Sequence, residues 1–314
     1  MPAALTIENL SVGYLRGKHQ QVLLQNLRLA LQPGKLVCFM GSNGIGKSTL
    51  IRTLAGLQPP LAGHISQTTA TDVALVLTDR VSALHMTVDE LIAFGRYPYL
   101  NWSATLTAED ARILNEVVDL VHIRHLLGKR LYELSDGQLQ MVMIARALAQ
   151  RTPVILLDEP TAHLDLNNRL EVMNLLRGLT RLQNKAILVA THELDLALQT
   201  ADEIWLATSN NTIVSGIPED LVLNGAFDQV FQFKGFDLKT GKIHHEIHRE
   251  GKIRLVGSGH EYLWTKNALE RSGYEVVEQG GLEIRVQNGT WYTARATFHT
   301  IGALLHHLND HAAQ

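Results

Sequence analysis

A short apolar run that leads into a glycine-rich loop is the feature that most constrains the fold of this chain. Residues 36–40 are all apolar, which is typical of a strand buried on both faces of a sheet. The loop at residues 41–49 follows at once, and residues 47–55 have the pattern of a helix that ends at Gly56. A buried strand, a glycine-rich turn and a helix in this order predict a covered, mostly parallel sheet.

The loop at residues 41–49 has the spacing of a phosphate-binding loop. Its glycines let backbone N–H groups converge on phosphate oxygens, and the start of the helix adds donors and a favourable dipole. Lys47 is expected to reach the β- and γ-phosphates of a nucleotide, Ser48 to ligate Mg²⁺, and Thr49 to lie near the α-phosphate. The predicted phosphate-binding residues are Gly41, Ser42, Asn43, Gly44, Gly46, Lys47, Ser48 and Thr49.

Two carboxylates follow a second apolar run, at residues 154–157. Asp158, at the end of the expected strand, can hold Mg²⁺, usually through water, and Glu159 can orient or deprotonate an attacking water. An ordinary acidic helix cap is the alternative interpretation, and Pro160 and the later Leu164-Asp165 pair argue against it. We therefore predict a metal ligand at Asp158 and a catalytic base at Glu159.

A histidine follows a third apolar run, at residues 186–190. His192 is placed to touch the γ-phosphate and to sense its loss. A lone histidine is more often a structural residue, but its position at a strand end at this point in the topology favours a functional role. Lys47, Glu159 and His192 are therefore the predicted catalytic residues.

Residues 86–150 are predicted to form a helical insert within the parallel core, with Thr87, Thr107 and Ser135 as the N-caps of three helices. The pentapeptide Leu134-Ser135-Asp136-Gly137-Gln138 gives the third helix an amino end that can face a phosphate. One copy of the chain offers no phosphate at that end. The pentapeptide therefore implies that a second copy supplies it.

Five motifs together resemble the nucleotide-binding subunit of an ATP-binding-cassette (ABC) transporter over about residues 1–230. They are the phosphate loop at 41–49, the pentapeptide at 134–138, the Asp158-Glu159 pair, the Leu164-Asp165 loop and His192. The resemblance implies an α/β P-loop cassette with a mainly parallel core sheet and a helical insert. An antiparallel β subdomain is expected from residues 5–13 and 22–31, which alternate apolar and polar side chains.

The resemblance also assigns roles at a site shared by a homodimer of cassettes that binds ATP and Mg²⁺. Ser135 and Gly137, with Gln138 in the same pentapeptide, are expected to face the γ-phosphate held by the other subunit. Asp165 is expected to help couple the two sites. Tyr14 lies where the family has an aromatic residue that stacks on adenine, although a tyrosine in a strand is also a common packing residue.

Three segments resemble the importers of iron–siderophore complexes, haem or cobalamin. These are residues 87–91, 95–99 and 161–165. The resemblance implies an ATPase that drives import through an integral membrane permease and, indirectly, a substrate-binding protein. Such a subunit would lie at the cytoplasmic face of the bacterial inner membrane. An exporter subunit and a non-hydrolysing regulatory cassette protein are the alternatives.

Two positions depart from the family pattern. The family has a Gln after the strand expected at residues 73–77, where this chain has Thr78. The Thr78 hydroxyl is the predicted third metal ligand, and Asp79 or the backbone are the alternatives. Asp136 replaces a Gly of the pentapeptide; it favours the helix dipole and should point away from an incoming γ-phosphate.

The C-terminal part is expected to add a small α+β domain at residues 253–314, after a polar linker at 231–252. Ser258 is the predicted cap of its first helix, while the glycines around it give only a weak match to a dinucleotide-binding loop. The linker histidines are spaced so that they could bind metal, but a solvated stretch is the alternative interpretation; they are His244, His245 and His248.

Composition limits the partners that this chain can have. The formal net charge is −3 without a basic run, which argues against nucleic acid as a partner. A single cysteine, Cys38, fits a reducing compartment and a buried strand position. No apolar run approaches the roughly 20 residues of a membrane span, and the first residues lack a signal-peptide pattern. We therefore expect contact with a membrane only through a partner.

Overall fold

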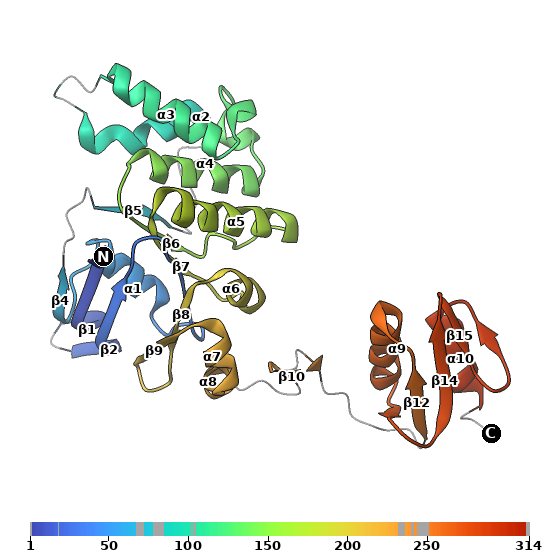
Figure 1. The fold of residues 1–314 in the computed structure, drawn as a ribbon. Helices are drawn as coiled ribbons and strands as arrows, with labels where there is room; N and C mark the ends of the chain where they lie inside the picture. The colour runs from blue at the N-terminus through green and yellow to red at the C-terminus, as the bar shows by residue number, and fades with distance from the viewer. Residues whose placement is uncertain are drawn as a thin grey trace. The chain divides into compact units, whose positions relative to one another are not determined.

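The computed structural model describes residues 2–17, 19–66, 72–77, 85–100, 102, 105–231, 236–239, 242–243 and 251–311. The chain divides into two compact units, Met1–Gln232 and Phe233–Gln314, and Figure 1 shows both as a ribbon. Each unit has its own cluster of buried apolar side chains. Each therefore has the separate core that an independently folding domain requires.

Six strands form the central sheet of the first unit, in the order β5-β6-β7-β3-β8-β9. They are β3 (Leu36–Met40), β5 (Val73–Val76), β6 (Val154–Asp158), β7 (Ala186–Ala190), β8 (Glu203–Ala207) and β9 (Ile213–Gly216). All neighbouring strands are parallel except β8 and β9. Every residue of β3, β6 and β7 is buried, which confirms the prediction from their apolar runs.

Helices and a second sheet cover this core. The helices are α1 (Lys47–Leu54), α5 (Leu166–Gln183), α6 (Leu194–Thr200), α7 (Pro218–Leu223) and α8 (Ala226–Phe231). Helix α1 contacts β6 and β7, and α5 contacts β3 and β7. Inside these layers Cys38 is completely buried, and burial raises the pKa of its thiol to about 12.

The antiparallel subdomain has three strands in the order β2-β1-β4. Its strands are β1 (Leu5–Arg16), β2 (His19–Leu31) and β4 (Ala62–Ser66). The pairing of β1 with β2 confirms the prediction, whereas β4 was not predicted, because its exposed sequence lacks an apolar alternation. Apolar residues of β1 and β2 join those of α1 and the central sheet in one core, which places this subdomain beside the phosphate loop.

The helical insert lies between β5 and β6, as predicted, and Figure 1 shows its helices stacked beyond the central sheet. Its elements are α2 (Val88–Ala93), the 3₁₀ helix η1 (Phe94–Tyr99), α3 (Ala108–Leu120), the short 3₁₀ turns η2 (Arg124–Leu126) and η3 (Leu131–Glu133), and α4 (Asp136–Ala149). Thr87, Thr107 and Ser135 cap α2, α3 and α4 through complete capping boxes, which confirms all three predicted caps. Within the described part of the chain, no helix has the length and apolar character to cross a membrane.

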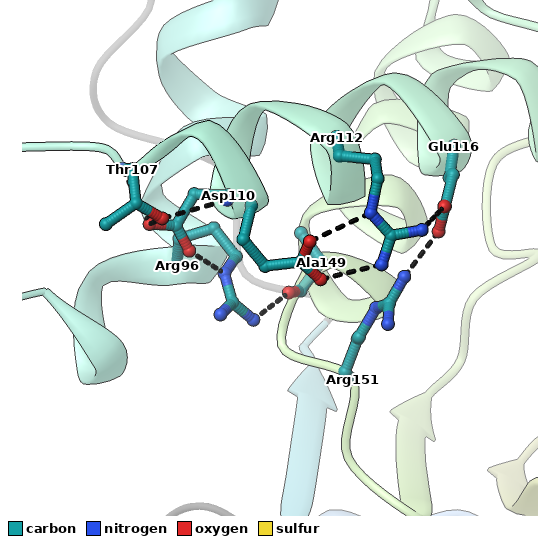
Figure 2. Close-up of polar contacts among 8 residues, drawn as sticks. Arg96, Thr107, Asp110, Arg112, Glu116, Ala149 and Arg151 are labelled. Carbon is teal, nitrogen blue, oxygen red and sulfur yellow. Dashed lines mark hydrogen bonds and ion pairs between the residues drawn. The ribbon is translucent and has the colours of Figure 1, made fainter.

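Arg96 in η1 is the buried centre of this insert (Figure 2). Its Nε donates to Asp110 Oδ1 at 2.8 Å and its Nη1 donates to the Ala149 carbonyl at 2.9 Å. Asp110 also accepts hydrogen bonds from the backbone and hydroxyl of Thr107. One guanidinium therefore joins η1 to the start of α3 and the end of α4. A more exposed network lies beside it and consists of Glu109, Arg112, Glu116 and Arg151.

We expect Arg96→Met to lower the free energy of unfolding of the first unit by about 3 kcal/mol, because the guanidinium is buried and its partners are left unpaired. Hydrogen bonds from Thr107 and then from Arg96 lower the pKa of Asp110 from 3.8 to about 2. The stabilisation that the ionised Asp110 gives to the folded unit is therefore complete above pH 3.8 and is lost as the pH falls towards about 2.

Urea unfolding across that pH range measures the effect of the Arg96 substitution. The difference between the Arg96→Met variant and the unaltered protein should shrink as Asp110 becomes protonated. Arg112→Met is the control, because it removes exposed ion pairs from the neighbouring helix and should cost much less. Equal destabilisation by the two substitutions would contradict the role given to Arg96.

The second unit holds a five-stranded sheet in the order β13-β12-β14-β15-β16, with two helices. Its elements are β12 (Lys252–Val256), α9 (Gly259–Arg271), β13 (Glu275–Val277), β14 (Leu282–Gln287), β15 (Thr290–Tyr292), β16 (Thr297–Phe298) and α10 (Ile301–His311). The predicted strands and helices are present, and β16 is an additional short strand. A two-stranded pair, β10 (Phe236–Asp237) with β11 (Lys242–Ile243), lies between the two large sheets in sequence.

The predicted cap of the first helix of the second unit is confirmed in position. Ser258 is the N-cap residue of α9, although its side chain makes no capping hydrogen bond among the described residues. Gly259, the first residue of α9, has a φ of 77°, so the backbone at this helix start is not regular. The predicted metal-binding histidines at 244, 245 and 248 lie outside the described residues.

We expect Trp291→Ala to destabilise the second unit by about 3–5 kcal/mol without changing the stability of the first. Trp291 is buried, and its indole N–H donates to the buried Thr265 hydroxyl at 2.6 Å. Calorimetry should show the loss of one unfolding transition, while the other keeps its midpoint. Trp264→Ala, at an exposed position of α9, is the control and should preserve both transitions. A lower midpoint of the remaining transition in the Trp291 variant would show that the units depend on each other.

Candidate functional site

Three neighbouring parallel strands, β6, β7 and β3, bring the predicted catalytic residues to one edge of the central sheet. Strand β3 leads into the phosphate loop, β6 ends at Asp158 beside Glu159, and β7 is followed by Thr191 and His192. Ligands of open α/β sheets bind at the carboxyl ends of the strands. The predicted phosphate loop, carboxylates and histidine therefore share one site.

The phosphate loop leaves backbone donors available for a ligand. Gly44 and Gly46 have φ values of 79° and 113°, which favour glycine, and a Cβ at Gly46 would lie 3.0 Å from Leu23 Cβ. Among the described residues no side chain caps the start of α1, whereas α2, α3, α4 and α5 all have side-chain caps. The first amides of α1 are therefore left to an anion, and the positive end of the helix dipole favours one there.

Lys47 lies within this loop rather than extending into solvent. It is buried, and its Nζ donates to the Gly41 carbonyl at 3.0 Å and to the Ser42 carbonyl at 3.4 Å. Burial lowers the pKa of Lys47, while the nearby charges of Glu159 and Asp158 act in the opposite direction. An anionic ligand in the loop would therefore stabilise the charged form of this side chain.

Asp158 and Ser48, two of the predicted metal ligands, lie next to each other. Asp158 is buried, and this burial raises the pKa of its carboxyl group, while a hydrogen bond with Ser48 acts in the opposite direction. A hydroxyl and a carboxylate oxygen at one point are ligands of the kind that Mg²⁺ prefers. Thr78, the third predicted metal ligand, lies outside the described residues.

Glu159 and His192 are in direct contact. The Glu159 Oε2 atom lies 3.2 Å from His192 Nδ1, and the Glu159 amide donates to the Ala190 carbonyl at 2.8 Å. Glu159 has a φ of 47°, which is unfavourable for a residue with a Cβ and is common at functional sites. The backbone at the end of β6 therefore places this side chain beside the histidine and next to Asp158.

Tyr14 also contacts the phosphate loop, from the antiparallel subdomain. Its hydroxyl forms a 2.8 Å hydrogen bond with the Thr49 hydroxyl, and 42% of the side chain is exposed. An exposed aromatic ring beside the start of α1 can accept a base stacked on it. The structure thus places Tyr14 next to the phosphate-binding residues, and its contact with adenine stays a prediction.

The pentapeptide residues and Asp165 form a second cluster, at the amino ends of α4 and α5. The Ser135 hydroxyl accepts from the Gln138 amide at 3.3 Å, and Gln138 Oε1 accepts from the Ser135 amide at 3.1 Å. Gly137 is buried, and a Cβ there would lie 2.8 Å from Asn168 Cγ. Asp165 caps α5 by accepting from the Asn168 amide at 2.9 Å. Asn168 therefore joins the two helix starts.

Sequence reasoning missed two of the residues that support these clusters. Asn168 stands three residues after Asp165, which is the spacing of a helix cap and could have indicated its role. Arg169, the next residue, contacts both the Leu164 carbonyl and Glu193. No local pattern connects residues this far apart in sequence. Asp136, in the first turn of α4, is exposed.

Comparison with known proteins identifies the family. A family model described as ABC transporter matches residues 24–162, and one described as iron ABC transporter C-terminal domain matches residues 250–309. An uncharacterized ABC transporter ATP-binding protein of Methanocaldococcus jannaschii is 34% identical over 293 residues, which cover 87% of this chain and 98% of that protein. This chain belongs to the ABC transporter family of ATP-binding proteins.

Two further similarities agree with this assignment of the cassette. The iron(3+)-hydroxamate import ATP-binding protein FhuC of Bacillus subtilis is 30% identical over 73% of this chain and 88% of that protein. A solved structure described as an ABC transporter of the metal-chelate type, in an inward-facing conformation, has a TM-score of 0.67 at 29% identity and covers 74% of this chain and 90% of that chain. The predicted cassette fold and ATPase class are confirmed.

Proposed function

We propose that this ABC ATPase powers the import of a ferric siderophore or a similar iron chelate through a membrane permease. The observation that carries the proposal is the match of residues 250–309 to the iron ABC transporter C-terminal domain. The relative that acts in iron(3+)-hydroxamate import supports both the direction of transport and the class of cargo. The cassette would work at the cytoplasmic face of the inner membrane and reach its cargo only through the permease and a substrate-binding protein.

The proposed hydrolysis depends on positioning and charge at the edge of β3, β6 and β7. The loop amides and Lys47 would bind the phosphates of ATP and stabilise the charge that develops on them. Glu159 would hold the attacking water and accept its proton, because the end of β6 places its carboxylate beside Asp158 and in contact with His192. His192, 3.2 Å from that carboxylate, would orient it and contact the γ-phosphate.

Ser48 and Asp158 are the proposed Mg²⁺ ligands. The hydrogen bond between them brings two hard oxygen ligands together at the end of β6, next to Lys47. A magnesium ion bound there would supply positive charge to the β- and γ-phosphates. Thr78 is proposed as a further ligand from the residues that follow β5.

A homodimer is the proposed active unit. Ser135, Gly137 and Gln138 surround the amino end of α4, which can stabilise an anion that comes from outside this copy. Two copies would therefore hold two ATP molecules, each between the phosphate loop of one copy and the α4 start of the other. Asn168 packs against Gly137 and donates to Asp165, so Asp165 lies close to the start of α4. Asp165 would therefore also contact the partner copy when the dimer forms.

Reconstitution with the permease tests this function. The cassette, its permease and its binding protein should be placed in liposomes and supplied with a ferric siderophore, haem or cobalamin. We expect uptake of the ferric siderophore that requires ATP and that stops with the Glu159→Gln cassette. ATP-dependent uptake of haem or cobalamin alone, or outward movement of the chelate, would overturn the proposed cargo or direction.

A further inference from the structure

Arg169, in the first turn of α5, contacts the two segments that carry Asp165 and His192. Its Nε donates to the Leu164 carbonyl at 2.6 Å, and its Nη1 lies 3.4 Å from Glu193 Oε1. Leu164 immediately precedes Asp165, and Glu193 immediately follows His192. One guanidinium therefore joins a segment that would face the partner copy to the segment that follows β7.

The Arg169–Glu193 contact is well placed to transmit a displacement. The Glu193 side chain is only 11% exposed, and its Oε2 atom is buried without a hydrogen-bond partner among the described residues. The Glu193 amide donates to the hydroxyl of the buried Thr191 at 3.1 Å, which fixes the turn around His192. The Arg169 side chain is 38% exposed, so its contact with Glu193 is partly shielded from water and is stronger than a fully exposed ion pair. Movement of Arg169 would therefore shift the backbone on which His192 sits.

We propose that Arg169 is a positioning residue for ATP hydrolysis, acting through Glu193 on His192 and Glu159. The proposal rests on the function proposed above, in which Asp165 meets the partner copy and Glu159 activates water. When the partner copy contacts the Leu164-Asp165 segment, the position of that segment sets the position of the Arg169 side chain. Arg169 in turn sets the position of Glu193. His192, which contacts Glu159 at 3.2 Å, is then held in the hydrolytic arrangement.

The chemistry of arginine suits this role. A guanidinium is planar and donates in several fixed directions, so it can bond to a carbonyl and a carboxylate at once. A lysine ammonium at the end of a flexible stem meets one of these partners well, but not both. Lys at position 169 should therefore restore part of the function and Met none.

Arg177 provides a matched control on the same helix. It lies two turns after Arg169, and its Nη1 donates to the Gln199 carbonyl at 3.0 Å, near the end of α6. Arg177 therefore also joins α5 to the segment that follows β7, but without contact to Leu164 or Glu193. A general loss of packing between α5 and α6 would affect both arginine substitutions alike.

The test compares five variants of the full chain: R169M, R169K, E193Q, R169M/E193Q and R177M. We expect R169M and E193Q each to lower kcat about 10- to 100-fold, because small displacements of catalytic groups have effects of this size. The Kd for ATP should stay within about twofold, since the phosphate loop is unchanged. The kcat of the double variant should be no lower than that of the slower single variant. R169K should have an intermediate kcat, and R177M should have the kcat of the unaltered protein.

Three kinetic results would overturn the role of Arg169. They are an unchanged kcat in R169M, additive losses in the double variant, or an equal loss in R177M. Melting temperatures of all variants reveal whether a low kcat reflects unfolding, and a loss confined to stability would also reject the proposal. Failure of the proposed function has a different signature: the unaltered protein itself would lack ATP-driven dimerisation or transport.

Discussion

Replacing Glu159 by Gln is expected to lower the kcat for ATP hydrolysis at least about 100-fold, as loss of a general base does. The amide has the same shape as the carboxylate and can keep its place beside His192, but it cannot accept a proton from water. Binding of ATP should therefore persist. Because hydrolysis no longer separates the two copies, the ATP-bound dimer should accumulate.

Phosphate release, equilibrium titration with ATP and size-exclusion chromatography together measure these effects of the Glu159 substitution. Glu171→Gln, at an exposed position of α5, is the matched control and should behave as the unaltered protein does. Normal turnover in the Glu159 variant would remove this residue as the base. Loss of ATP binding would instead indicate that the carboxylate is needed for the fold of the site.

Replacing Lys47 by Met is expected to weaken ATP binding by about 2–5 kcal/mol, as when one member of a buried charge pair is removed. The ammonium group is buried within the phosphate loop, where it would meet the charge of the β- and γ-phosphates. Methionine has a similar length but offers no donor and no charge. Hydrolysis should then be undetectable at ATP concentrations that saturate the unaltered protein.

Calorimetric titration with ATP checks this loss of affinity. Lys35→Met is the control, because Lys35 is exposed just before β3, at the opposite end of that strand from the phosphate loop. Both variants lose one positive charge, so a general electrostatic effect would appear in both. Equal ATP affinity in the Lys47 variant and the unaltered protein would contradict the proposed phosphate contact.

Local signals explain why much of the cassette could be predicted from its sequence. The β3–loop–α1 unit follows from an apolar run and a set of glycines, and capping boxes at Thr87, Thr107 and Ser135 mark helix starts within four residues of sequence. Strand β8 is buried except for Glu203, but it was not predicted, because its apolar run of four residues fits a helix as well as a strand.

Contacts between distant residues could not be predicted. Arg96 and Asp110 pair across 14 positions, and Arg169 and Glu193 meet although most of α5 and all of β7 separate them in sequence. Charged residues are ordinarily exposed, so only the packed structure reveals that Arg96, Asp110 and Glu193 are largely shielded from water. The position of the site, at the edge of the sheet where β3, β6 and β7 end, was predictable because the ends of parallel strands meet at one edge. The contacts that support the site depend on tertiary packing.

The burial of Cys38 has a practical consequence for thiol chemistry. The chain has one cysteine, and the pKa of this thiol is raised to about 12. It therefore stays protonated and enclosed near neutral pH, so it does not supply the thiolate that attacks maleimides and disulfide reagents. Any cysteine introduced on the surface becomes the sole reactive position without prior removal of the native one. With cysteines placed at Ser42 and Ser135, a disulfide between two copies would form when the phosphate loop of one copy meets the start of α4 of the other.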